Sequence, residues 1–87
     1  MTEDQIGVVV NYYAKPGVAA VNVLKGSIQK GDYLKYKGYT TDFTEQVVSI
    51  EIENQPVPEA KAGDLIGVKV SQKVREKDKV YKVMDPS

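Results

Sequence analysis

Glu51 and Glu53 are the residues whose types and spacing come closest to catalytic chemistry. They lie two positions apart in a segment with strand-like alternation, so their carboxylates would share one face. Paired carboxylates can act as general acid and general base. No further catalytic group lies near them in the sequence, which also lacks cysteine and histidine. This composition removes cysteine nucleophiles, histidine bases and the usual zinc ligands. We therefore expect a non-enzymatic protein with no catalytic residues, metal site or cofactor.

A second group of side chains could bind nucleic acid. Leu34 and Tyr36 alternate with Tyr33, Lys35 and Lys37, so the latter three would face solvent from one strand. Lysines attract phosphates, and tyrosines can stack on unpaired bases. The candidate RNA-binding residues are Tyr33, Lys35, Lys37, Lys69, Lys73, Arg75 and Lys79. The alternative is a lysine-rich surface that keeps a small domain soluble and discourages pairing between sheet edges.

The net charge of the chain is zero, but the charges are unevenly distributed. Residues 1–41 carry +2, from five lysines and three acids, and residues 42–68 carry −5, from six acids and one lysine. Residues 69–87 carry +3, from six basic residues and three acids. An ordinary solvated surface and a basic patch built by the last strands both stay open. A zero net charge counts against RNA, because dedicated nucleic-acid binders are usually basic.

The elements that must position these side chains are joined by a turn signature that occurs three times. It reads Lys30-Gly31-Asp32, Ala62-Gly63-Asp64 and Glu76-Lys77-Asp78, and apolar residues at strand spacing follow each time. Glycine supplies the positive φ that a tight turn often needs, and the aspartate carboxylate can accept a hydrogen bond from a nearby backbone N–H. Turns of this kind between β-rich segments indicate a small all-β domain.

Six segments have the β-branched and aromatic composition of strands, and none has a convincing helical periodicity. The predicted strands cover residues 6–13, 18–24, 32–37, 43–53, 65–70 and 80–83, with a β-bulge inside the longest. The predicted core consists of Val9, Ala19, Val21, Val23, Leu34, Tyr36, Val47, Ile50, Ile52, Ile66, Val68, Val70 and Val80. Ile6, Val8 and Val10 should lie on the opposite face of the first strand, as a second buried layer or as an exposed patch for a partner.

This organisation predicts one domain over residues 1–87, with a core from 6 to 83 and frayed termini. Six or seven short strands would close into a small barrel, which removes the sheet edges. The absence of cysteine, of a signal peptide and of an apolar run near 18 residues favours a cytoplasmic protein with no membrane partner. The initial Met favours a complete small protein over a fragment.

Several of these segments in succession resemble a known family. Residues 28–34, 48–51 and 60–68, which include both Gly-Asp turns, are similar to domain 2 of translational GTPases, of which elongation factor Tu is the best-known member. The resemblance covers roughly residues 6–83 and implies a closed Greek-key barrel of six or seven strands. Lys77 stands where the family usually has glycine. The phosphate-binding G-x-x-x-x-G-K-[ST] loop is absent, so a GTPase activity and a nucleotide cofactor are not expected.

The resemblance implies a function in translation. In the family, acidic residues of this domain hold the aminoacylated end of transfer RNA, and the matching positions are Glu51 and Asp64. Glu53 stands where the family has an aromatic residue, and Asp64 could serve only to cap its turn. The leading hypothesis is a barrel that binds transfer RNA, ribosomal RNA or a translation-related protein. The alternative is a protein-interaction adaptor or appended recruitment domain with no RNA role.

Overall fold

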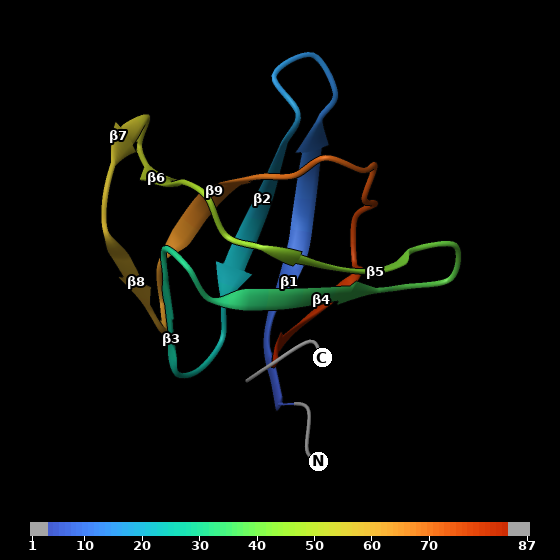
Figure 1. Ribbon diagram of the computed structural model, residues 1–87, viewed down its shortest axis with the longest axis horizontal. Helices are drawn as coiled ribbons and strands as arrows, with labels where there is room; N and C mark the ends of the chain where they lie inside the picture. The colour runs from blue at the N-terminus through green and yellow to red at the C-terminus, as the bar shows by residue number, and fades with distance from the viewer. Residues whose placement is uncertain (1–3, 84–87) are drawn as a thin grey trace.

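The computed structural model describes residues 4–83, which form ten β-strands and no helix (Figure 1). No helix in this part of the chain is therefore long and apolar enough to cross a membrane. The strands are β1 (Asp4–Tyr13), β2 (Val18–Val23), β3 (Ser27–Gln29), β4 (Tyr33–Lys37), β5 (Asp42–Gln46), β6 (Ile50–Ile52), β7 (Gln55–Pro56), β8 (Glu59–Lys61), β9 (Leu65–Lys69) and β10 (Lys79–Val83). The all-β prediction is confirmed. The predicted fraying concerned the chain ends, which lie outside the described residues.

Eight of the strands form one antiparallel sheet in the order β5-β4-β10-β1-β2-β9-β6-β7, and β3 pairs with β8 in a second, small sheet. The large sheet curls around the core, but β5 and β7 do not pair with each other, so the sheet is open (Figure 1). The prediction of a closed barrel of six or seven strands was therefore wrong. One reason lies in β7, which has only two residues, one of them a proline that cannot donate to a further ladder.

The three predicted turns share one hydrogen-bond pattern. Gly31, Gly63 and Lys77 have φ of 98°, 98° and 75°. The following aspartate accepts a hydrogen bond from the backbone N–H three residues earlier, as a capped turn requires. The donor–acceptor pairs are Gln29 N to Asp32 Oδ2 (2.8 Å), Lys61 N to Asp64 Oδ2 (2.9 Å) and Arg75 N to Asp78 Oδ2 (2.8 Å). The chemistry predicted for the repeated signature is confirmed.

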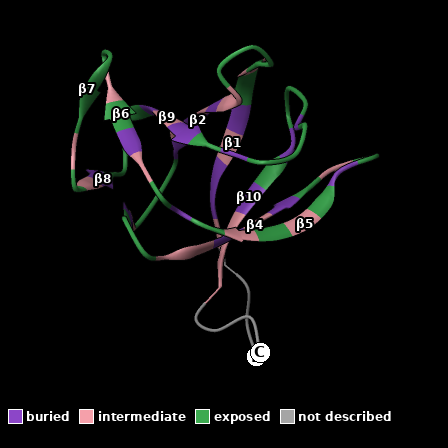
Figure 2. Ribbon diagram, turned by 45° about the horizontal axis from the view of Figure 1, so that its top comes forward, coloured by how far each residue is buried: buried purple, intermediate pink, exposed green. Residues whose placement is uncertain are grey.

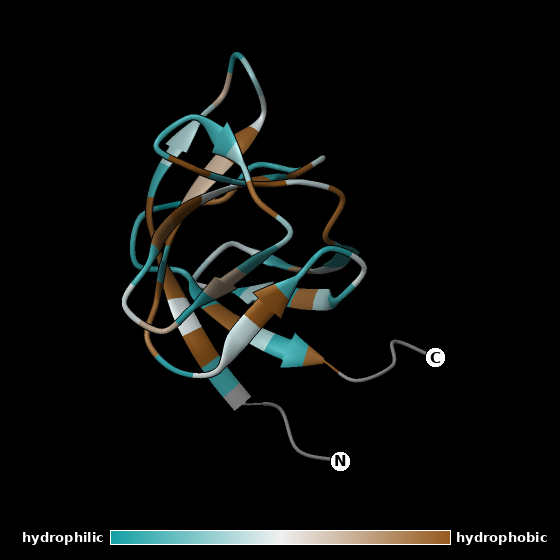
Figure 3. Cartoon of the chain, turned by 90° about the vertical axis from the view of Figure 1, so that its left-hand side faces the viewer, coloured by the Kyte–Doolittle hydropathy of each residue, from teal (hydrophilic) through white to brown (hydrophobic). Residues whose placement is uncertain are grey.

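The core lies on the inner face of the curled sheet, and exposed residues gather in turns and in short strands such as β7 (Figure 2). Apolar and polar residues both occur along the curled sheet (Figure 3), and burial alternates along strands such as β2 and β4. All predicted core residues are buried except Ile52, which is half-buried against the core. Four buried apolar residues lie outside the predicted core, namely Ile6, Ile28, Ala60 and Val74, and burial of Ile6 was one of the two predicted alternatives.

Ile6 is buried because β1 contains two irregularities in register. One lies between Gln5 and Gly7 opposite β10, and the other lies between Val9 and Asn11 opposite β2. Each extra residue reverses the inward and outward phase of the strand. Ile6 therefore shares the core with Val9, although strict alternation predicts opposite faces. Val10 remains 37% exposed, so residues 6, 8 and 10 do not form one apolar face.

The long strand predicted over residues 43–53 is divided into β5 and β6. Between them, the Val47 N–H donates to the Asp32 carbonyl (2.8 Å), and the Val47 carbonyl accepts from the Gly31 N–H (2.9 Å). These bonds tie the segment to the turn before β4. The chain then turns at Glu53 and Asn54, where φ is 52° and 65°, so that β6 pairs with β7.

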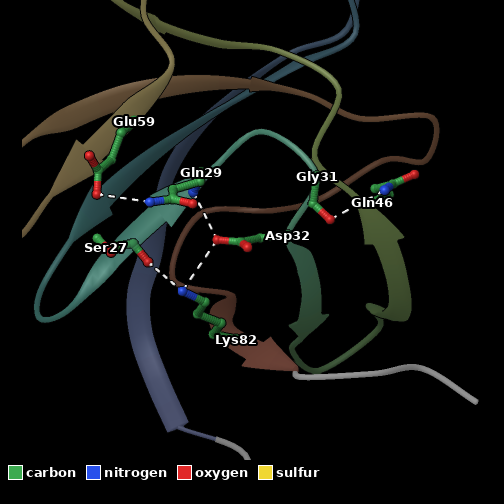
Figure 4. A network of polar contacts seen from close by, with 7 residues as sticks. All are labelled: Ser27, Gln29, Gly31, Asp32, Gln46, Glu59 and Lys82. Atoms are coloured by element: carbon green, nitrogen blue, oxygen red, sulfur yellow. Dashed lines mark hydrogen bonds and ion pairs between the residues drawn. The ribbon is translucent and has the colours of Figure 1, made fainter.

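A polar network joins the small sheet to the large one (Figure 4). The Lys82 ammonium on β10 donates to the Ser27 carbonyl (3.2 Å) and forms an ion pair with Asp32 Oδ2 (3.3 Å). Gln29 Nε2 donates across the β3–β8 pair to Glu59 Oε2 (3.2 Å). The network fixes the turn before β4 against the C-terminal strand.

Candidate binding groove

A groove with a volume of about 400 Å³ lies on the face of the sheet opposite the core. It crosses β2, β9 and β6 and is bounded by two hairpin turns. Its lining residues are Tyr13, Pro16, Val18, Ala20, Glu51, Glu53, Asn54, Leu65, Ile66 and Gly67. The volume falls within the range of about 300–1,000 Å³ that is usual for ligand sites. We refer to this feature as the β2–β9 groove.

The floor of the β2–β9 groove is low because two small residues face each other across the ladder. Ala20 on β2 is the register partner of Gly67 on β9, while the neighbouring Ala19 and Val68 are buried in the core. Strand alternation therefore directs Ala20 and Gly67 outward. A Cβ at Gly67 would lie 3.2 Å from Val18 Cγ1, which is tight. Side chains of ordinary size at this pair would fill the groove.

The apolar rim of the groove comes from Tyr13, Pro16 and Leu65. Tyr13 is 50% exposed and Leu65 is 57% exposed, so both present apolar surface at the groove. The Tyr13 hydroxyl oxygen accepts a hydrogen bond from Asn11 Nδ2 (3.3 Å), which orients the ring. The β1–β2 and β6–β7 turns project from the same end of the molecule (Figures 1 and 2).

The charged residues that line the groove are both acidic. Glu51 lies on β6 opposite Gly67 of β9, and Glu53 is the first residue of the β6–β7 turn. Both side chains are exposed. Two carboxylates that line the same largely apolar groove favour a cationic ligand over an anionic one.

Of the two acids expected in an acceptor-end pocket, Glu51 lines the groove and Asp64 does not. Asp64 caps its own turn by accepting the Lys61 N–H. The two carboxylates therefore have separate surroundings. Ala20 and Leu65 were not predicted as site residues from the sequence, and Tyr13 was considered only as an addition to the RNA-binding face. The glycine at position 67, inside a strand, was the one signal that could have indicated a close approach or a ligand there.

The residues predicted to bind RNA are only partly brought together. Lys37 is the register partner of Lys79, and Lys35 is the partner of Tyr81, so Tyr33, Lys35, Lys37 and Lys79 share the outer face of β4 and β10. The Lys37 ammonium lies 3.6 Å from Asp42 Oδ2.

The other basic candidates lie elsewhere. Lys69 is on β9, which β1 and β2 separate from β10 in the sheet. Lys73 and Arg75 are exposed in the connection from β9 to β10. These three basic residues therefore do not lie on the outer face of β4 and β10.

Outside the β2–β9 groove, the described surface has a smaller cavity. A second cavity of about 250 Å³ is lined by Lys30, Ser49, Ile50, Pro56, Val57 and Pro58. Within residues 4–83, no group of three acidic side chains is arranged to hold a metal ion.

Comparison with known proteins relates the chain to proteases. No family model matches it. It is 42% identical over 78 residues to a protein of Methanocaldococcus jannaschii named an uncharacterized protease, and 33% identical over 78 residues to a collagenase of Porphyromonas gingivalis. Each match covers 88% of this chain but only 19% and 22% of the relatives. The chain thus spans about a fifth of the length of these relatives.

Solved structures give the same relationship for the fold. Two crystal structures of the C-terminal domain of a protein from Geobacillus thermoleovorans, described as a U32 peptidase, superpose on the chain with a TM-score of 0.85. Their sequence identities are 21% and 20%, and the matches cover 91% and 92% of this chain and 99% and 92% of those chains. The chain therefore has the fold of that C-terminal domain.

These findings correct the family and the function inferred from the sequence. The relatives are named protease and collagenase, and the structural neighbours come from a peptidase; none is a translation factor. The translational GTPase resemblance and the translation-factor-like RNA-binding function were therefore wrong. The Gly-Asp signature was misleading because it encodes a capped turn, and any small β-domain can use the same local solution.

Proposed function

We propose that this chain is a non-catalytic accessory domain of a peptidase and that it binds the polypeptide on which the catalytic part acts. The observation that carries this proposal is the match of 88% of the chain to about a fifth of two proteins named as proteases. A unit of that size leaves most of such a protein for the catalytic machinery. The fold shared with a peptidase's C-terminal domain supports the same assignment.

The residues of the chain support a binding role more than a catalytic one. The sequence has no cysteine or histidine, and Glu51 and Glu53 are exposed side chains on an open surface. General acid–base catalysis by carboxylates usually relies on burial or close partners that tune their pKa. The β2–β9 groove combines apolar side chains with two carboxylates, which suits recognition of a peptide segment.

The proposal is tested in the collagenase of Porphyromonas gingivalis, from which the segment that matches this chain is deleted or replaced by this chain. The deletion should raise KM for gelatin, because the accessory site is lost, and leave hydrolysis of a short peptide unchanged. The chimera should restore the affinity for gelatin. The 87-residue chain alone should cleave neither substrate. Cleavage by the chain alone, or an unchanged KM in the deletion variant, would contradict the proposal.

A further inference from the structure

We propose that the β2–β9 groove binds an extended polypeptide segment through an arginine side chain. This inference rests on the proposed function, since it names the chemistry that the polypeptide must present. The groove is open on the sheet surface, and its floor is the Ala20–Gly67 pair. A peptide backbone can approach closely above these two residues, because neither carries a side chain beyond Cβ.

The apolar rim fits the alkyl part of an arginine. Leu65 and Pro16 provide aliphatic surface, and the Tyr13 ring is held by Asn11 at the edge of the groove. Guanidinium groups stack on aromatic faces, and their methylene stems pack along apolar surface. An arginine therefore matches both components of this rim with one side chain.

The carboxylates fit the head group of the same residue. Glu51 and Glu53 are the charged side chains among the described residues that line the groove. A guanidinium presents five donors in a planar fork and can bind two carboxylate oxygens at once, whereas an ammonium acts as a point charge. The described residues that line the groove include no cation, and the cation on the same outer face of β9 is Lys69, two residues beyond Gly67. A phosphate-bearing ligand would meet repulsion at the same position.

The test uses the 87-residue chain and two blocked pentapeptides, acetyl-Ala-Ala-Arg-Ala-Ala-amide and the same peptide with citrulline in place of arginine. Citrulline keeps the shape of arginine but carries no charge. Binding is followed by the NMR shifts of the Ala20 and Gly67 amides. We expect the arginine peptide to bind roughly tenfold to a hundredfold more tightly, which is the usual gain from hydrogen bonds to charged groups. The difference should shrink in high salt.

Matched variants locate the site. E51Q with E53Q should reduce the affinity for the arginine peptide to that for the citrulline peptide. E59Q with E76Q removes the same number of charges outside the groove and should have no effect. Ala20→Leu should abolish binding by filling the floor, while Thr44→Leu, which adds an apolar side chain on exposed β5, should not.

Each contrary outcome is informative. Equal affinities for the arginine and citrulline peptides, or full affinity in E51Q with E53Q, would overturn the inference, and so would an absence of binding by the unmodified chain. If Ala20→Leu abolished binding while E51Q with E53Q kept full affinity, the groove would bind an apolar group of the peptide and not the arginine head group. The accessory-domain proposal is judged separately by the KM of the deleted collagenase, so the failure of one does not decide the other.

Discussion

Each of the three aspartates that end a turn accepts the same backbone hydrogen bond, but the residue before it differs. Gly31 and Gly63 have φ of 98°, and a Cβ at either would meet no atom within 4 Å. Lys77 has φ of 75° in spite of its side chain. Any cost of a side chain at position 63 is therefore conformational rather than steric.

Gly63→Val should consequently destabilise the domain by about 1–2 kcal/mol, because a β-branched residue resists positive φ. Lys77→Gly should be nearly neutral. Glycine relieves the backbone strain at this positive φ. It also raises the conformational entropy of the unfolded chain, which costs about 0.4–1 kcal/mol of stability, so the two effects nearly cancel. Urea unfolding of both variants measures the difference. Equal effects of the two substitutions would contradict the conformational explanation.

Gly38 has a different reason to be glycine. A Cβ there would overlap the carboxylate of Asp78, which is 4% exposed and caps the turn before β10. Gly38→Ala should cost about 1–3 kcal/mol by forcing this buried group to move. The cost should be much smaller in an Asp78→Ala background, and a double-mutant cycle measures the coupling. Additive effects would show that the two residues do not compete for space.

Tyr36 predicts a specific dependence on pH. Burial, together with the Glu45 carboxylate, raises the pKa of its hydroxyl above the ordinary value. The folded state therefore keeps this proton at pH values where the unfolded chain loses it. The free energy of unfolding is therefore unaffected by this group below about pH 10. It falls at higher pH by up to about 1.4 kcal/mol per pH unit, because only the unfolded chain then loses the proton. Tyr36→Phe keeps the ring stacked on Phe43 and should flatten the decline seen in urea unfolding above pH 10, whereas exposed Tyr39→Phe should not.

At the level of the elements, the sequence identified the strands that follow a simple alternation and failed where the chain departs from it. Residues 18–24 and 32–37 were predicted well because their inward positions alternate strictly. The two bulges of β1 reverse the phase, and of the two only the first has a glycine, Gly7, beside it as a local sign. β3 and β8 have three residues each, which is too short for a period to appear.

The same limit applies to the candidate site. Glu51 and Glu53 stood out in the sequence because of their charge, and both line the β2–β9 groove. Tyr13 and Leu65 looked like ordinary strand residues, and they meet at the groove only because β9 pairs with β2 at long range. Pairing partners far apart in sequence leave no local signal. For Asp64 the sequence left a turn cap and a ligand pocket open, and its hydrogen bond to the Lys61 N–H confirms the turn cap.

The β6–β7 hairpin links stability to the proposed site. Glu53 and Asn54 both have positive φ, as in a two-residue type I′ turn, where asparagine and glycine are preferred. Glu53→Asn should therefore stabilise the domain by about 0.5–1 kcal/mol, while it weakens binding of the arginine peptide. Thermal unfolding and the NMR titration measure the two effects. A stabilised variant that keeps full affinity would remove Glu53 from the site.

At the scale of the whole molecule, the order of the strands differs greatly from their order in sequence. β10, the last strand, lies between β4 and the N-terminal β1, in the interior of the eight-stranded sheet. Its pairing with both neighbours joins β4 and β5 to the strands that carry the groove. Val80 is fully buried, and Lys82 connects the small sheet to the same strand. The fold is therefore complete only when its C-terminal strand is in place.

A chain that ends after Lys77 should consequently fail to fold, although it retains nine of the ten described strands. Without β10, β1 and β4 expose the backbone groups that pair with it, and the core loses Val80. We expect the truncated chain to give a poorly dispersed NMR spectrum and no cooperative urea transition. A peptide of residues 78–87 added in trans should restore both, and the peptide with Val80→Asp should not. Cooperative unfolding of the truncated chain alone would contradict this prediction, because it would mean that β4 and β5 stay attached to β1 and β2 without β10 between them.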